Sequence, residues 1–220
     1  GIFGSERLVP AVVSFVDIAG IVKGASEGEG LGNKILANIR EADAICQVVR
    51  AFADDDVVHV AGRVDPADDI EVVHTELILA DLQTLEKAIP RLEKEVKGKK
   101  TDRSVLETAL VAQEKLNAGT PLHAVRGLDL APIRELSLMT AKPFLYVFNV
   151  DETGLSDAGL QEKMRALVAP ADAIFLDAKL ESQLVELEPE EAAVVLAGVG
   201  QDVSGLEQLA RIGVHTPGLQ

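Results

Sequence analysis

The sequence predicts an α/β protein with a mostly parallel sheet, flanked by helices and interrupted by an antiparallel helical hairpin. Short apolar blocks alternate with stretches of helical periodicity, as in parallel sheets whose strands are buried on both faces. Between the second and third blocks lie two long stretches with apolar residues at helical spacing, joined by a polar turn. These two observations set the fold class.

Four apolar blocks are the expected strands, over residues 12–17, 44–50, 144–149 and 173–177. Helices are expected from near Asn33 to near Asp43, and over 130–140, 157–167, 188–198 and 205–212. Three of the strands end on polar residues, namely Asp17, Asn149 and Asp177. Because open α/β sheets bind ligands at the carboxyl ends of their strands, this edge is the candidate site.

The hairpin is expected to begin at residues 65–69, where Pro66 and acidic residues suit a first helical turn. Its first helix extends to about Val96 and its second covers 104–117, and Pro90 should kink the first. The predicted organisation is therefore a body formed by residues 1–67 and 126–220, with an inserted hairpin over 68–125.

Basic side chains gather around the tip of the hairpin: Lys87, Arg91, Lys94, Lys97, Lys99, Lys100 and Arg103. They form either a solvated helical face, paired with neighbouring glutamates, or a contact surface for RNA or a ribosome. The chain as a whole has 36 acidic and 21 basic residues and a net charge of −15, which opposes a broad phosphate-binding footprint. A nucleic acid contact therefore requires this local patch.

The remaining composition indicates a soluble cytoplasmic protein. Cys46 is the single cysteine, which rules out an internal disulfide and favours a reducing compartment. No run of about 18 apolar residues is present, so no membrane partner is expected. The aspartates at 54–56 lack the alternating spacing of a metal-binding loop and are interpreted as a solvated acidic turn.

Two short motifs point to a nucleotide. Asp17 and Gly20 form a DxxG motif at a strand end, which would place Asp17 near Mg²⁺ and the Gly20 N–H near a γ-phosphate. Asn149 and Glu152 form an NxxE motif after the third strand. The guanine-reading form is NKxD, and the longer acid would leave guanine poorly satisfied, so adenine is favoured. The alternative is that Asn149 only begins a turn.

Several segments together resemble the YchF-type Obg-like ATPases. They are DIAG at 17–20, VKGAS at 22–26, GEGLGNK at 28–34, ANIRE at 37–41, VVHV at 57–60, PADDIE at 66–71, and the NxxE motif. The resemblance runs from about Glu6 to Gln220. It implies a Ras-like P-loop NTPase domain interrupted by a helical hairpin, hydrolysing ATP rather than GTP with Mg²⁺, and associated with ribosomes in the cytoplasm.

The resemblance also implies roles for residues near the phosphates. Asp17 matches the Mg²⁺-associated aspartate, and the Gly20 N–H matches the γ-phosphate donor. Ile21 stands where Ras-like enzymes carry a water-positioning glutamine, which an aliphatic side chain cannot replace. His59 matches the proposed substitute, because a neutral imidazole can position or deprotonate water near pH 7. Otherwise His59 is a loop histidine without a catalytic role.

For the base, the resemblance implies an adenine-reading segment at Asn149, Val150 and Glu152. Asp177 and Ala178 match the last base-contacting loop, which is usually Ser-Ala, so the aspartate makes this match loose.

The sequence departs from the family in lacking a GxxxxGK[ST] P-loop. The glycine run at 28–34 carries Glu29 and lacks the Lys-Ser/Thr ending, so it is interpreted as a switch loop. The family's C-terminal TGS domain would begin just after Gln220. The chain therefore resembles the central section of such a protein, and we expect it to bind ATP weakly or not at all by itself.

Two other classes of function remain open. The chain could be a ribosome- or RNA-binding module that acts without catalysis through the tip residues Lys94, Lys97, Lys99, Lys100 and Arg103. It could also be a non-nucleotide α/β domain in which the DxxG and NxxE motifs are coincidental.

Overall fold

The computed structural model describes Gly24 and residues 31–52 and 64–215 of the 220-residue chain. The first expected strand, over 12–17, lies outside the described residues. So do four of the expected site residues, Asp17, Gly20, Ile21 and His59.

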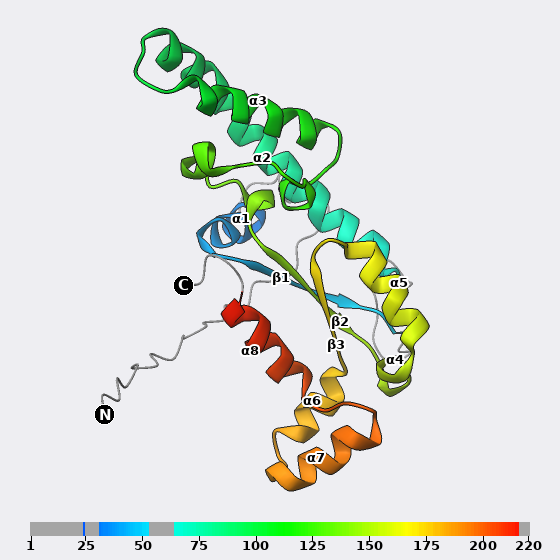
Figure 1. Cartoon of the computed structure of the whole chain (residues 1–220). Coiled ribbons are helices and arrows are strands. Elements are labelled where there is room, and N and C mark those ends of the chain that lie inside the picture. The colour runs from blue at the N-terminus through cyan, green and yellow to red at the C-terminus, as the bar shows by residue number, and fades with distance from the viewer. Residues whose placement is uncertain (1–23, 25–30, 53–63, 216–220) are drawn as a thin grey trace, which may run out of the picture.

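The described part of the chain is built on a parallel three-stranded sheet (Figure 1). The strands are β1 (Ile45–Arg50), β2 (Phe144–Asn149) and β3 (Asp172–Leu176), in the order β1-β2-β3. In register, Arg50 lies opposite Asn149, and Asn149 lies opposite Leu176. The three strands therefore end at one edge, which confirms the expected parallel arrangement.

Helices cover both faces of this sheet. Tyr146 and Phe148 of β2 are fully buried in a core shared with α1 (Leu31–Glu41), the hairpin helix α2 (Pro66–Lys97) and α5 (Ala158–Val168). On the opposite face, Val147 and Ile174 pack against α8 (Gly205–His215). Three further helices follow the strands: α4 (Glu152–Ser156), α6 (Ala178–Leu184) and α7 (Pro189–Gly198).

The expected hairpin is formed by α2 and α3 (Arg103–Asn117), which project from the body in Figure 1. The Asp65 side chain caps α2 by accepting from the Asp68 N–H, and Pro66 occupies the first turn. Helix α2 continues through Pro90 without being divided into two helices. The hairpin has its own apolar core, in which Leu85 and Leu116 are fully buried.

The α-helix expected over 130–140 is wrong. The structure has the 3₁₀ turns η2 (Ala131–Leu136) and η3 (Met139–Ala141) there, after an earlier turn η1 (Leu122–Ala124). Ile133 departs from helical geometry at φ −112° and ψ 18°, and Ser137 adopts a left-handed φ of 49°. Apolar spacing suggested a helix, but the backbone turns twice to bring the chain into β2.

None of the described helices combines the length and the apolar composition needed to cross a membrane.

Candidate nucleotide-base site

The ends of β2 and β3 are joined by a hydrogen bond from the backbone to a side chain. Asn149 is the last residue of β2 and is half-buried, and its Oδ1 accepts from the Ala178 N–H at 3.1 Å. One residue further on, the Val150 N–H donates to the Leu176 carbonyl at 2.8 Å. The structure therefore brings together two segments, 149–152 and 177–178, that are expected to contact one base.

The two acids after Asn149 have different surroundings. Asp151 caps α4, and its Oδ1 accepts from the Gly154 N–H at 2.8 Å. Glu152 is the first residue of α4 and is exposed, and its carboxylate makes no hydrogen bond or ion pair with the described residues. Glu152 is therefore available to a ligand, whereas Asp151 fixes the backbone that carries it. This capping role was not predicted from the sequence, although aspartate is a preferred N-cap residue.

Val150 contributes to the core. Its side chain is only 1% exposed and packs against Gly154, where an added Cβ would lie 2.8 Å from the Val150 Cβ. In that position the side chain cannot cover a base, as lysine does in the guanine-reading motif. The buried side chain anchors the loop between Asn149 and α4, and the contact of Val150 with a base stays a prediction.

The carboxylate of Asp177 is likewise committed to the fold. Its Oδ1 accepts from the N–H groups of Lys179 at 2.9 Å and Leu180 at 3.2 Å, at the start of α6. This cap holds Ala178, whose own N–H is bound to Asn149. The segment therefore orients the Asn149 amide, and the base contact expected from Asp177 and Ala178 stays a prediction.

The Asn149 Oδ1 accepts from the Ala178 N–H. The Nδ2 of the same amide has no hydrogen-bond partner among the described residues. A purine offers ring nitrogens as acceptors, and its exocyclic amine or the ribose hydroxyls can donate to a carboxylate. The Asn149 donor and the Glu152 acceptor therefore have the chemistry to contact a purine nucleoside.

The end of β1 adds two residues that the sequence analysis missed. Arg50 is opposite Asn149 in the sheet register, and its guanidinium carbon lies 5.8 Å from the centre of the Phe52 ring. A cation and an aromatic ring thus lie beside the candidate base site. No local motif marked them, because only the strand register places them at this edge.

The segment expected to contact the phosphates is described only at Gly24. Its N–H donates to Glu76 Oε1 at 2.6 Å, and Glu76 is 3% exposed on α2. The described residues contain no group of three or more His, Cys, Asp or Glu side chains suited to a metal. Asp17, beside which Mg²⁺ is expected, lies outside the described residues.

A parallel sheet with helices on both faces, carrying an oriented asparagine at its carboxyl edge, defines the class of protein. With the likeness to the solved structure given below, it is a Ras-like P-loop NTPase fold with an inserted helical hairpin.

No protein-family model matches the chain. It is 45% identical over 223 residues to the ribosome-binding ATPase YchF of Bacillus subtilis, covering 97% of this chain and 61% of that protein. It is also 45% identical to the ribosome-binding ATPase YchF of Haemophilus influenzae, covering 98% of this chain and 61% of the relative. The solved structure of the Schizosaccharomyces pombe YchF GTPase matches with a TM-score of 0.72 and 29% identity, covering 90% of this chain and 56% of that one.

This chain is therefore similar to YchF proteins over nearly its whole length. It spans 61% of the length of the curated relatives named above.

Proposed function

We propose that this chain is the base-binding and hairpin part of a cytoplasmic, ribosome-associated ATPase that uses ATP with Mg²⁺. The observation that carries the proposal is the Asn149 amide, whose oxygen is held by the Ala178 N–H while its nitrogen and the nearby Glu152 carboxylate remain available. The names of the relatives, ribosome-binding ATPase YchF, support the same activity and partner.

The proposed preference for ATP follows from Glu152. A guanine-reading aspartate accepts two hydrogen bonds from one edge of the base, and the extra methylene of glutamate displaces both oxygens. A buried donor left without its partner costs about 1–3 kcal/mol, or roughly a factor of 5 to 150 in affinity. Adenine presents a different pattern of donors and acceptors and avoids this penalty.

The proposed hydrolysis relies on residues outside the described part. Asp17 would hold Mg²⁺, which supplies charge neutralisation at the phosphates, and the Gly20 N–H would contact the γ-phosphate. His59 would position water in place of the glutamine that Ile21 replaces. These roles remain predictions.

The base site can be tested without a phosphate cradle by using nucleosides. In the 220-residue chain, millimolar adenosine should shift the NMR signals of the Asn149 side-chain amide and the Ala178 N–H, and guanosine should not. Asn149→Ala should abolish the response, whereas Asn117→Ala, at the end of α3, should leave it unchanged. Equal responses to the two nucleosides would contradict the proposed adenine preference.

A second candidate function is a ribosome- or RNA-binding module at the tip of the hairpin. Arg103 is paired with Glu107 at 2.9 Å, but Lys94, Lys97, Lys99 and Lys100 form no ion pair with the described residues. All four lysines are exposed. They are therefore free to contact phosphates, although the chain as a whole is acidic.

This module is tested by co-sedimentation with ribosomes at several salt concentrations. Replacing Lys97, Lys99 and Lys100 by Gln should weaken binding. The slope of the logarithm of the binding constant against the logarithm of the salt concentration should fall in magnitude by about one per lost phosphate contact. The matched control is Lys163→Gln, because Lys163 is an exposed lysine on α5. Retention of the full salt slope in the triple variant would exclude the tip as the contact surface.

A further inference from the structure

Helix α7 is apolar around most of its surface, but the rest of the described structure covers it on one side only. After Glu191, residues 192–199 contain no polar side chain. Leu196 and Val199 point inward and are 9% and 8% exposed, whereas Val194 is 73% exposed. A helix that is apolar on every side is normally buried on every side, so the outer face of α7 lacks a partner within the described residues.

Exposed apolar side chains also occur on the elements beside α7. Val185, which follows α6, is 75% exposed, and Leu206 at the start of α8 is 49% exposed. Figure 1 shows α6, α7 and the start of α8 together at the end of the molecule opposite the hairpin. The Gly205 N–H donates to the buried Glu181 carboxylate at 2.5 Å, which ties α8 to α6. These three elements therefore form one unit, named here the α6–α8 end.

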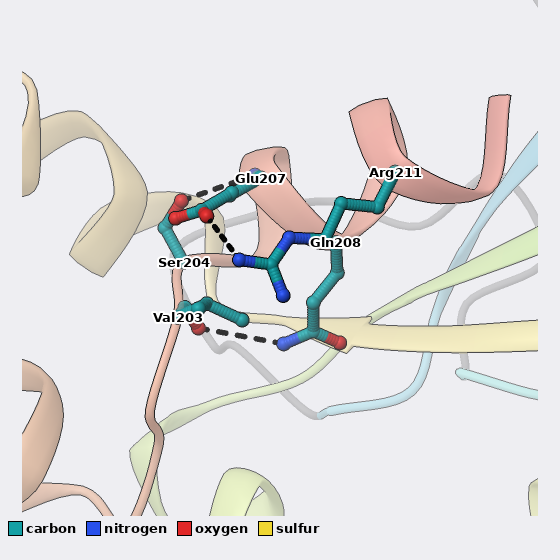
Figure 2. A network of polar contacts seen from close by, with 5 residues as sticks. All are labelled: Val203, Ser204, Glu207, Gln208 and Arg211. Atoms are coloured by element: carbon teal, nitrogen blue, oxygen red, sulfur yellow. Dashed lines mark hydrogen bonds and ion pairs between the residues drawn. The ribbon is translucent and has the colours of Figure 1, made fainter. Parts of the chain in front are cut away.

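The α6–α8 end is strongly acidic. No Lys, Arg or His occurs between Lys179 and Arg211. The same interval contains seven acids: Glu181, Glu186, Glu188, Glu190, Glu191, Asp202 and Glu207. Arg211 is itself engaged, since its guanidinium lies 2.6 Å from Glu207 Oε1 (Figure 2).

Part of this charge has a local explanation. Glu190 and Glu191 lie in the first turn of α7, where acids are stabilised by the helix dipole. That effect accounts for the position of these two acids. It does not account for the absence of balancing cations or for the exposed Val194 next to them along the helix.

We propose that the outer face of α7, with Val185 and Leu206, is a docking surface for a basic amphipathic segment of a protein partner. The apolar side of such a segment would cover Val194, and its lysines or arginines would meet the surrounding glutamates. The charge pattern disfavours RNA and anionic membranes, which carry the same sign. It also disfavours a second copy of this chain, because identical acidic surfaces would face each other.

The test uses a fluorescent 18-residue peptide of leucine and lysine, with leucines at i, i+3, i+4 and i+7. Its control is a scrambled peptide of the same composition, since a chain with net charge −15 attracts any cation. Anisotropy titrations should show tighter binding of the amphipathic peptide. Val194→Ser should reduce its affinity about fivefold to tenfold, which corresponds to loss of most of one valine's burial.

Two further variants separate charge from apolar contact. Glu190→Gln combined with Glu191→Gln should weaken binding and reduce its salt dependence. Leu110→Ser, at a 43% exposed position on α3, should leave the affinity unchanged. Since Val194 is exposed, Val194→Ser should fold normally, and circular dichroism with a thermal melt verifies this.

The proposal is overturned if the scrambled peptide binds as tightly as the amphipathic one, or if Leu110→Ser and Val194→Ser have equal effects. It is also overturned if sedimentation shows self-association that Val194→Ser abolishes, which would assign the face to a second copy. Binding of a short RNA that is lost in Val194→Ser would contradict it as well.

Discussion

The carboxylate of Asp81 binds Thr140 twice, although the two residues are far apart in the sequence. Asp81 Oδ2 accepts from the Thr140 N–H at 2.8 Å and from its hydroxyl at 2.7 Å, and Oδ1 accepts from the Met139 N–H at 2.8 Å. Asp81 is fully buried within α2. This contact fixes the first hairpin helix to the turn that leads into β2.

Removing this carboxylate should destabilise the fold strongly. Asp81→Ala leaves three buried donors without an acceptor, so we expect a loss of about 3–5 kcal/mol in the free energy of unfolding. Asp81→Asn keeps the shape of the side chain but can accept hydrogen bonds at only one atom. It should therefore lose less unfolding free energy than Asp81→Ala. Urea denaturation measures both. The matched control is Asp129→Asn, because Asp129 is exposed and its Oδ1 accepts from the Ala131 N–H. A loss of unfolding free energy in this control as large as that in Asp81→Asn would contradict this account.

The Asp177 cap should support both α6 and the candidate base site. Asp177→Ala removes the acceptor for two backbone N–H groups and should cost about 1 kcal/mol, whereas Asp177→Ser should retain most of the stability. The Ala178 amide signal should move in Asp177→Ala because its hydrogen bond to Asn149 depends on this turn. Thermal denaturation measures the stability, and NMR measures the Ala178 amide signal. An unchanged Ala178 signal would show that the turn keeps its conformation without the Asp177 cap.

Gly154 should not tolerate a side chain. A Cβ there would lie 2.8 Å from the Val150 Cβ, which is itself buried, so Gly154→Ala should destabilise by about 1–3 kcal/mol. The same replacement at the exposed Gly159 on α5 meets only Asp157 Oδ1 at 3.4 Å, and should be neutral or slightly stabilising. Chemical denaturation of the pair provides the comparison. Equal stabilities would mean that the Val150 packing is not as tight as described.

His74 should make the fold sensitive to acid. Its Nε2 lies 2.5 Å from the Tyr146 hydroxyl, and its ring centre is 5.6 Å from that of His123. Burial, followed by the charge of His123, lowers the pKa of His74 from 6.5 to about 4. As the pH falls from 6.5 towards 4, the unfolded chain therefore binds a proton that the folded chain resists, and stability decreases.

Replacing His74 by Gln removes this titration and should flatten the decline in urea midpoint between pH 7 and pH 4.5. A residual slope is expected because burial also lowers the pKa of His123. A slope in His74→Gln as steep as that of the unmodified chain would show that other groups dominate acid unfolding.

Local sequence patterns predicted much of the body and the hairpin, because each apolar block or stripe records which face of an element is buried. The same patterns failed at 130–140, where apolar spacing resembled a helix but the backbone forms two 3₁₀ turns held in part by Asp81. At the candidate site, Asn149 and Glu152 were recognised by their spacing. The burial of Val150 was not, because it depends on a core shared with other elements. The capping by Asp177 was also not predicted, although it is local and involves only Lys179 and Leu180.

The sequence by itself determined the α/β class, the hairpin and the position of an NxxE motif after a buried strand, since these depend on periodicity and spacing along one segment. Only the tertiary structure decided which atoms of that motif remain available. The Asn149 Oδ1 accepts a hydrogen bond from the Ala178 N–H, and the Val150 side chain is buried in the core. The Glu152 side chain stays exposed. The physical reason is that hydrogen bonding and burial at a strand end are set by the neighbouring strand and the segment that follows it. Ala178, which begins α6 after β3, lies 29 residues from Asn149 in the chain.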